Sequence, residues 1–179
     1  QNDRAALSAG FLKAVRLIML ISCPLYLGMA VTAQPLVDVM MGPKWTEAAP
    51  LVAILALAMP VMTLHILFAP ALNALGLPNI VVRNSLFGAL LMPSVYLFAV
   101  NYGADGLAWG WLVAFPILLI FTIYQARPHI GFTLRGLAGA VVPGFAAAAI
   151  MAALVWAVDH MVLKALWPDV PALIHLAVL

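Results

Sequence analysis

The stretch that decides the fold is residues 51–75, which read LVAILALAMPVMTLHILFAPALNAL. It contains no acidic residue, lysine or arginine, and its most polar side chains are His65 and Asn73. A helix needs about 20 residues to cross the roughly 30 Å of hydrocarbon in a bilayer. Because the run exceeds that length, it predicts a membrane-spanning helix.

Other apolar runs of similar length lie on both sides of it. The predicted complete spans are residues 11–33, 51–75, 85–100, 107–126 and 137–158, and residues 172–179 begin a sixth span that is cut short. The first span includes Lys13 and Arg16 near its start, where long basic side chains reach the membrane interface. The predicted fold class is therefore all-α, a polytopic transmembrane helical bundle with five complete spans plus a truncated sixth.

The composition of the whole chain also favours a location in the lipid bilayer. Of 179 residues, 66% are hydrophobic and 8% are charged. A soluble fold has too little polar surface to cover so many apolar residues, whereas lipid solvates them directly. The formal net charge of +2 is scattered, so no continuous basic face is expected and nucleic acid is excluded as a partner.

The basic residues separate when the loops are assigned alternately to the two sides of the membrane. One side receives Arg4, Lys13, Arg16, Arg83, Arg127 and Arg135, and the other receives Lys44 and Lys164. Loops rich in lysine and arginine stay in the cytoplasm. The N-terminal end is then cytoplasmic, residues 35–50 and 101–106 are external, and residues 76–84 and 127–136 are cytoplasmic.

Proline and glycine mark where the spans bend or pack. Prolines within the spans favour kinks, because each removes a backbone donor. They are Pro24, Pro60, Pro70, Pro93, Pro116 and Pro143. The spacing Gly106-x-x-x-Gly110 predicts close packing of helices within the chain.

No motif for catalysis occurs. The sequence lacks Gly-x-Ser-x-Gly, His-Glu-x-x-His, a Walker loop and a glycine-rich dinucleotide turn. His129, His160 and His175 are isolated from other ligand types, and Cys23 is the only cysteine. The chain is accordingly expected not to be an enzyme and to have no catalytic residue, cofactor or metal site.

Four polar residues are candidates for a substrate path: Arg16, His65, Asn73 and Arg83. His65 and Asn73 lie about two helical turns apart, so they share a helix face. A polar residue at membrane depth lines a path or hydrogen-bonds a neighbouring helix, and both interpretations remain open. Arg16 and Arg83 either contact a phosphate or only fix the topology.

Four short blocks of sequence follow one another in an order that resembles a known protein family. They are Phe11-Leu12-Lys13 before a span with Pro24 and Gly28, Gly42-Pro43-Lys44-Trp45-Thr46-Glu47-Ala48-Ala49-Pro50, Asn73-Ala74-Leu75-Gly76-Leu77-Pro78-Asn79, and Tyr102-Gly103-Ala104-Asp105-Gly106-Leu107-Ala108-Trp109-Gly110. Together they resemble the C-terminal half of the polysaccharide flippases, the O-antigen and exopolysaccharide exporters of the multidrug/oligosaccharidyl-lipid/polysaccharide superfamily. The resemblance covers about residues 3–159.

This resemblance implies a transporter of two similar halves, of which residues 1–179 would be the C-terminal one, around a cavity that opens alternately to each side. The implied cargo is an oligosaccharide on a polyprenyl diphosphate, which crosses the bacterial cytoplasmic (inner) membrane for lipopolysaccharide or exopolysaccharide biosynthesis. The implied partners are this lipid-linked oligosaccharide, membrane lipids and the missing N-terminal half. No functional position is carried over from the family.

Three other functions remain open. A drug or cation antiporter of the same superfamily needs a carboxylate within the membrane, and the complete spans contain none. A membrane-bound glycosyl- or acyltransferase should have clustered acids or histidines. A noncatalytic membrane scaffold would have His65, Asn73 and Arg83 packed against protein or turned to lipid.

Overall fold

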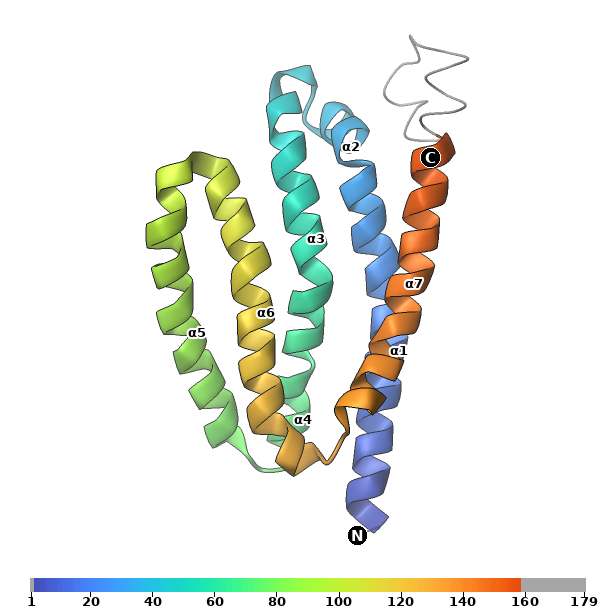
Figure 1. The fold of residues 1–179 in the computed structure, drawn as a ribbon, viewed down its shortest axis with the longest axis vertical. Helices are drawn as coiled ribbons and strands as arrows, with labels where there is room; N and C mark the ends of the chain where they lie inside the picture. Colours follow the sequence, from blue (N-terminus) through green and yellow to red (C-terminus); the bar gives the residue numbers. More distant parts are fainter. Residues whose placement is uncertain (1, 159–179) are drawn as a thin grey trace.

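The computed structural model describes residues 2–158, and they are helical from end to end apart from short links (Figure 1). The elements are α1 (Asn2–Val31), α2 (Ala33–Met40), the 3-10 helix η1 (Pro43–Ala48), α3 (Ala49–Ile66), α4 (Phe68–Ala74), α5 (Pro78–Ala99), the 3-10 helix η2 (Val100–Tyr102), α6 (Gly103–Ile130) and α7 (Leu134–Val158). The truncated sixth span predicted at residues 172–179, with Lys164, His160 and His175, lies outside the described residues.

Four stretches are long and apolar enough to cross a membrane: residues 5–31, 43–74, 78–130 and 134–155. The third contains both α5 and α6, which run antiparallel in Figure 1. The predicted all-α, polytopic fold is therefore confirmed, and α1, α3 with α4, α5, α6 and α7 supply the passes. The chain is a multi-pass membrane protein.

Several helix ends differ from the limits of the predicted spans, and two of them shorten the predicted cytoplasmic loops. Helix α5 begins at Pro78, well before residue 85, because proline suits the first turn of a helix. Gly76, with φ of 70°, closes the preceding helix in a left-handed conformation that favours glycine. Helix α6 continues through Pro128 to Ile130 instead of ending near residue 126. Residues 79–84 and 127–130 are consequently helical rather than loop.

The helices stand in a row. Helix α7 packs on α1, α1 on α3, α3 on α6, and α6 on α5. Helices α5 and α7 lie at opposite ends of the row (Figure 1). Within residues 2–158, the row therefore does not close into a ring, and each inner helix keeps faces that no other described helix covers.

Small residues let α7 approach α1 closely. The buried residues of α7 recur every three or four positions and include Ala140, Gly144 and Ala148. A Cβ atom on Gly144 would lie 2.6 Å from the backbone oxygen of Met19. The backbones of α1 and α7 are thus in direct contact at this point, which is the geometry that glycine permits between membrane helices.

Glycine has the same role between α5 and α6. A Cβ on Gly106 would overlap the backbone oxygen of Ala99, and a Cβ on Gly110 would lie 3.1 Å from a side-chain carbon of Val95. The predicted close packing at Gly106-x-x-x-Gly110 within the chain is confirmed.

Three aromatic rings pack against one another at one end of the row of helices. Phe11 on α1, Phe68 on α4 and Phe132 in the link before α7 have ring centroids 5.1 to 5.9 Å apart. All three side chains are buried. Tilted aromatic pairs at such distances add stability beyond their buried area, so the cluster fixes the links at this end.

The second predicted span is interrupted at Leu67, between α3 and α4. Pro70 lacks the N–H that would donate to the carbonyl of Ile66, so one hydrogen bond of the helical ladder is absent one turn before the proline, where the break lies. A similar break lies at Thr32, between α1 and α2, shortly before Pro35. The other prolines predicted to favour kinks lie inside unbroken helices, namely Pro24, Pro60, Pro93, Pro116 and Pro143.

The links alternate between the two ends of the row as the sequence predicts. The N-terminal end, the α4–α5 link and the α6–α7 link lie at one end, and the α2–η1 and α5–α6 connections lie at the other (Figure 1). The predicted basic loops therefore share an end with the N terminus.

Candidate substrate-path site

A large open cavity lies beside α6 at the end of the row that holds the basic links. It has a volume of about 830 Å³ and is walled by α5, α6 and the start of α7. Its lining residues are Ile80, Arg83, Ile120, Ile123, Tyr124, Gln125, Arg127, Pro128, His129 and Leu134. We call it the arginine cavity, because apolar side chains form most of its wall and two guanidinium groups supply its charge.

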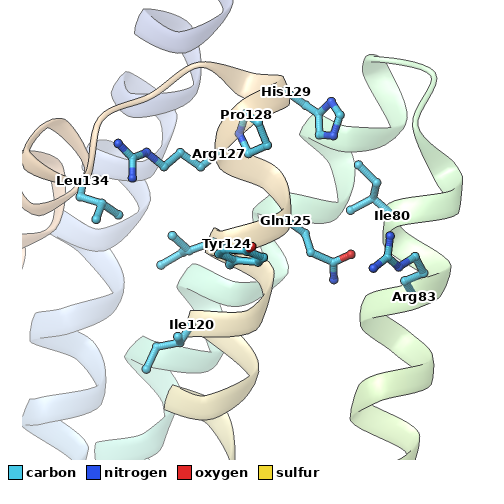
Figure 2. A pocket seen from close by; sticks show the side chains of 10 residues that line it. Ile80, Arg83, Ile120, Tyr124, Gln125, Arg127, Pro128, His129 and Leu134 are labelled. Atoms are coloured by element: carbon cyan, nitrogen blue, oxygen red, sulfur yellow. The ribbon is translucent and has the colours of Figure 1, made fainter.

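The two arginines come from different helices. Arg83 reaches from α5 and Arg127 from α6, on either side of Tyr124 and Gln125 (Figure 2). Helix α5 contains no acidic residue, and the acidic residue of α6, Asp105, lies in its first turn, at the far end of the helix. These two helices therefore place no carboxylate near the guanidinium groups, which supply the positive charge of the cavity lining.

Planar guanidinium groups bind phosphate oxygens through paired, charge-assisted hydrogen bonds. The isoleucines of the wall offer apolar contact at the same time. The arginine cavity is therefore suited to an amphipathic anion, with phosphate against the arginines and hydrocarbon against the wall.

A second cavity, of about 210 Å³, lies where α3, α4, α5 and α6 meet. Its polar lining residues are His65, Asn84, Ser85 and Thr122, and apolar side chains complete it. We call it the neutral cavity, since its lining includes no carboxylate, lysine or arginine.

One hydrogen bond links the walls of the two cavities. The Nε2 atom of Gln125, which lines the arginine cavity, donates to Oδ1 of Asn84, which lines the neutral cavity, over 2.6 Å. Gln125 is 9% exposed and Asn84 is 8% exposed. This buried pair joins α5 to α6, and it makes the two cavities neighbours.

The same region holds two buried atoms without a hydrogen-bond partner, Oγ1 of Thr122 and Oε1 of Gln125. Buried polar groups almost always have partners, because an unmade hydrogen bond costs about 1–3 kcal/mol. In hydrocarbon no bulk water can replace the missing partner. The site therefore has unused hydrogen-bonding capacity on α6.

The structure brings two of the four predicted path residues to these cavities. Arg83 lines the arginine cavity and half-buried His65 lines the neutral cavity. Arg16 and Asn73 are exposed and line neither, nor a third, apolar cavity of about 350 Å³ between α1 and α4. The helix break at Leu67 separates His65 from Asn73, so their shared face is interrupted.

Sequence reasoning missed Asn84, Thr122 and Gln125. It assigned Asn84 to a loop because the start of α5 was placed too late, and it passed over the two polar residues near the end of the fourth span. The signal was available, since polar side chains at membrane depth had already singled out His65.

Histidine, cysteine, aspartate and glutamate do not gather in groups of three or more anywhere in the described part of the chain. His129 lies at the rim of the arginine cavity, close to Ile80 in Figure 2. It adds an imidazole group to the two guanidinium groups of that wall.

Comparison with known proteins links the first part of the chain to a protein family. Residues 1–50, which comprise α1, α2, η1 and the first residues of α3, match a family model described as "Polysaccharide biosynthesis protein". No curated protein and no solved structure matches the chain significantly. The match and the apolar helices fit a multi-pass membrane protein of polysaccharide biosynthesis.

Proposed function

We propose that the protein is a flippase that moves a polyprenyl-diphosphate-linked oligosaccharide across the bacterial cytoplasmic membrane, and that it is a transporter rather than an enzyme. The observation that carries this proposal is the arginine cavity, in which Arg83 and Arg127 face a mostly apolar wall. The match of residues 1–50 to a polysaccharide biosynthesis family supports the same class of cargo.

The chemistry of the cargo explains why such a cavity is needed. A diphosphate carries negative charge that is very unfavourable in hydrocarbon. Two guanidinium groups offset that charge and replace the lost hydrogen bonds to water. The apolar wall accommodates the first part of the polyprenyl chain, while the remainder of the chain stays in the lipid.

The sidedness follows from the basic links. Because these links lie at the same end as the N terminus, the positive-inside rule assigns that end to the cytoplasm. The arginine cavity then opens to the cytoplasmic side, where its cargo would be collected. Alternating access requires a second half against which this row of helices moves, as in transporters built from two repeats.

The first test is translocation by the full-length protein in proteoliposomes, with a fluorescent polyprenyl-diphosphate oligosaccharide whose exposed fluorophore is quenched by a membrane-impermeant reductant. We expect Arg83→Ala and Arg127→Ala each to lower the initial rate about tenfold or more, since a hydrogen bond to a charged group is worth about 1.5–3 kcal/mol.

Arg135→Ala is the matched control. Arg135 is an exposed arginine in the first turn of α7 and does not line the arginine cavity. Its substitution should leave the rate within about twofold, as expected for an exposed charge. Absence of transport by wild type with several sugar donors would refute the proposed function, and equal rates for Arg83→Ala and Arg135→Ala would refute the role of the arginine cavity in it.

A further inference from the structure

Thr122 and Gln125 leave two hydrogen-bonding atoms unused on one face of α6. The residues are three apart in sequence, so their side chains are neighbours on the helix. Thr122 is 2% exposed and Gln125 is 9% exposed, and neither Oγ1 of Thr122 nor Oε1 of Gln125 has a partner. A helical threonine often bonds the carbonyl one turn back, but this hydroxyl does not.

The cavity beside Thr122 has hydrogen-bonding side chains but no acidic residue, lysine or arginine, whereas Gln125 lies at the boundary with the arginine cavity. His65, Asn84 and Ser85 line the neutral cavity together with Thr122. A phosphate would require cations there and a metal ion would require carboxylates, and the lining includes neither. A hydroxyl group fits better, because it donates and accepts at once: Oε1 of Gln125 needs a donor, and Oγ1 of Thr122 takes either role.

Asn84 determines which atom of Gln125 remains free. Because Nε2 of Gln125 donates to Asn84, the amide is held with Oε1 as the open acceptor. Asn84 is thus a positioning residue, and Gln125 and Thr122 are the contact residues.

The two cavities are arranged in the order of the groups in the proposed cargo. Arg83, which lines the arginine cavity, directly precedes Asn84, which lines the neutral cavity. In a lipid-linked oligosaccharide the first sugar is bonded directly to the diphosphate. The neutral cavity, at about 210 Å³, has room for about seven waters at roughly 30 Å³ each, so it suits a compact group rather than a whole oligosaccharide.

We propose that the sugar unit attached to the diphosphate lies in the neutral cavity, where one of its hydroxyls exchanges hydrogen bonds with Oγ1 of Thr122, and that a second hydroxyl, at the boundary with the arginine cavity, donates to Oε1 of Gln125. This inference rests on the proposed flippase function. It assigns recognition of the sugar to Thr122, Gln125 and Asn84, separately from recognition of the diphosphate by the arginines.

The test compares the affinities of the purified full-length protein for two lipids, polyprenyl diphosphate and the same lipid carrying one sugar. Wild type should prefer the sugar-bearing lipid. Thr122→Val, which has nearly the same shape, and Gln125→Met should each reduce that preference about two- to tenfold, the range for one neutral hydrogen bond. The affinity of Thr122→Val for the sugarless lipid should not change, because Thr122 does not line the arginine cavity.

Thr63→Val serves as the matched control, because Thr63 is a half-buried threonine of α3 that lines none of the three cavities. Arg83→Ala should weaken both lipids equally. If wild type binds both lipids equally well, or if Thr122→Val and Gln125→Met keep the wild-type preference, the sugar site is wrong and the flippase proposal stands. If wild type binds neither lipid, both proposals fail.

Discussion

At the scale of single residues, hydropathy identified polar side chains but not their surroundings. His65 and Arg83 were selected because they are polar near or within a span, and both line cavities. Arg16 and Asn73 were selected by the same reasoning and are exposed away from them. The difference depends on which helix covers which face, and a single sequence does not contain that information.

The unpartnered hydroxyl of Thr122 gives a stability prediction. Thr122→Val replaces a buried, unsatisfied hydroxyl with a methyl group of similar size, so we expect the free energy of unfolding to rise by about 1 kcal/mol. Denaturant titration of the purified protein in detergent, without lipid-linked sugar, measures this change.

The control is again Thr63→Val on α3, whose hydroxyl is not among the buried unpartnered atoms of the described chain. That substitution should be neutral or destabilising. A loss of stability in Thr122→Val would mean that its hydroxyl has a structural partner, and it would remove the main support for the sugar site.

At the scale of helices, length and apolar composition predicted most of the bundle. They were sufficient because every backbone polar group in hydrocarbon must be bonded within the segment, which leaves helices as the main solution. They did not predict the start of α5 at Pro78. The break at Leu67 lies one turn before Pro70, a proline at which the sequence did predict a kink. They also did not predict which helices are neighbours.

The α1–α7 contact provides a test at this scale. Gly144→Leu places a side chain against the backbone of Met19, where even a Cβ would lie at 2.6 Å, so α7 must move away from α1. We expect a loss of about 1–3 kcal/mol, as for other overpacked interiors. Thermal unfolding of the detergent-purified protein gives the measurement.

Gly139→Leu is the comparison on the same helix. Nothing lies within 4 Å of a Cβ at Gly139, so a leucine there should turn outward without loss of stability. Equal destabilisation by the two substitutions would show that the contact between α1 and α7 is not the cause.

At the scale of the whole molecule, the alternation of links predicts the sidedness. In a Cys23→Ala background, Ala104→Cys lies in the first turn of α6 and Thr133→Cys in the α6–α7 link, and both positions are exposed. A membrane-impermeant thiol reagent applied to intact cells should label Ala104→Cys but not Thr133→Cys, because the basic links stay in the cytoplasm.

Permeabilised cells provide the control, since both cysteines should then react. Labelling of Thr133→Cys alone in intact cells would invert the topology and place the arginine cavity on the external side. The proposed collection of cargo from the cytoplasm would then be wrong.

The break between α3 and α4 has a mechanical consequence. A continuous helix resists bending because bending stretches its backbone hydrogen bonds. Here the hydrogen bond to the carbonyl of Ile66 is already absent, because Pro70 has no N–H. Bending the segment at Leu67 breaks no further backbone hydrogen bond, so the segment bends most easily there. The residues on both sides of this joint, Ile66 and Phe68, line the neutral cavity. A small rotation about this one backbone position would therefore change the width of that cavity.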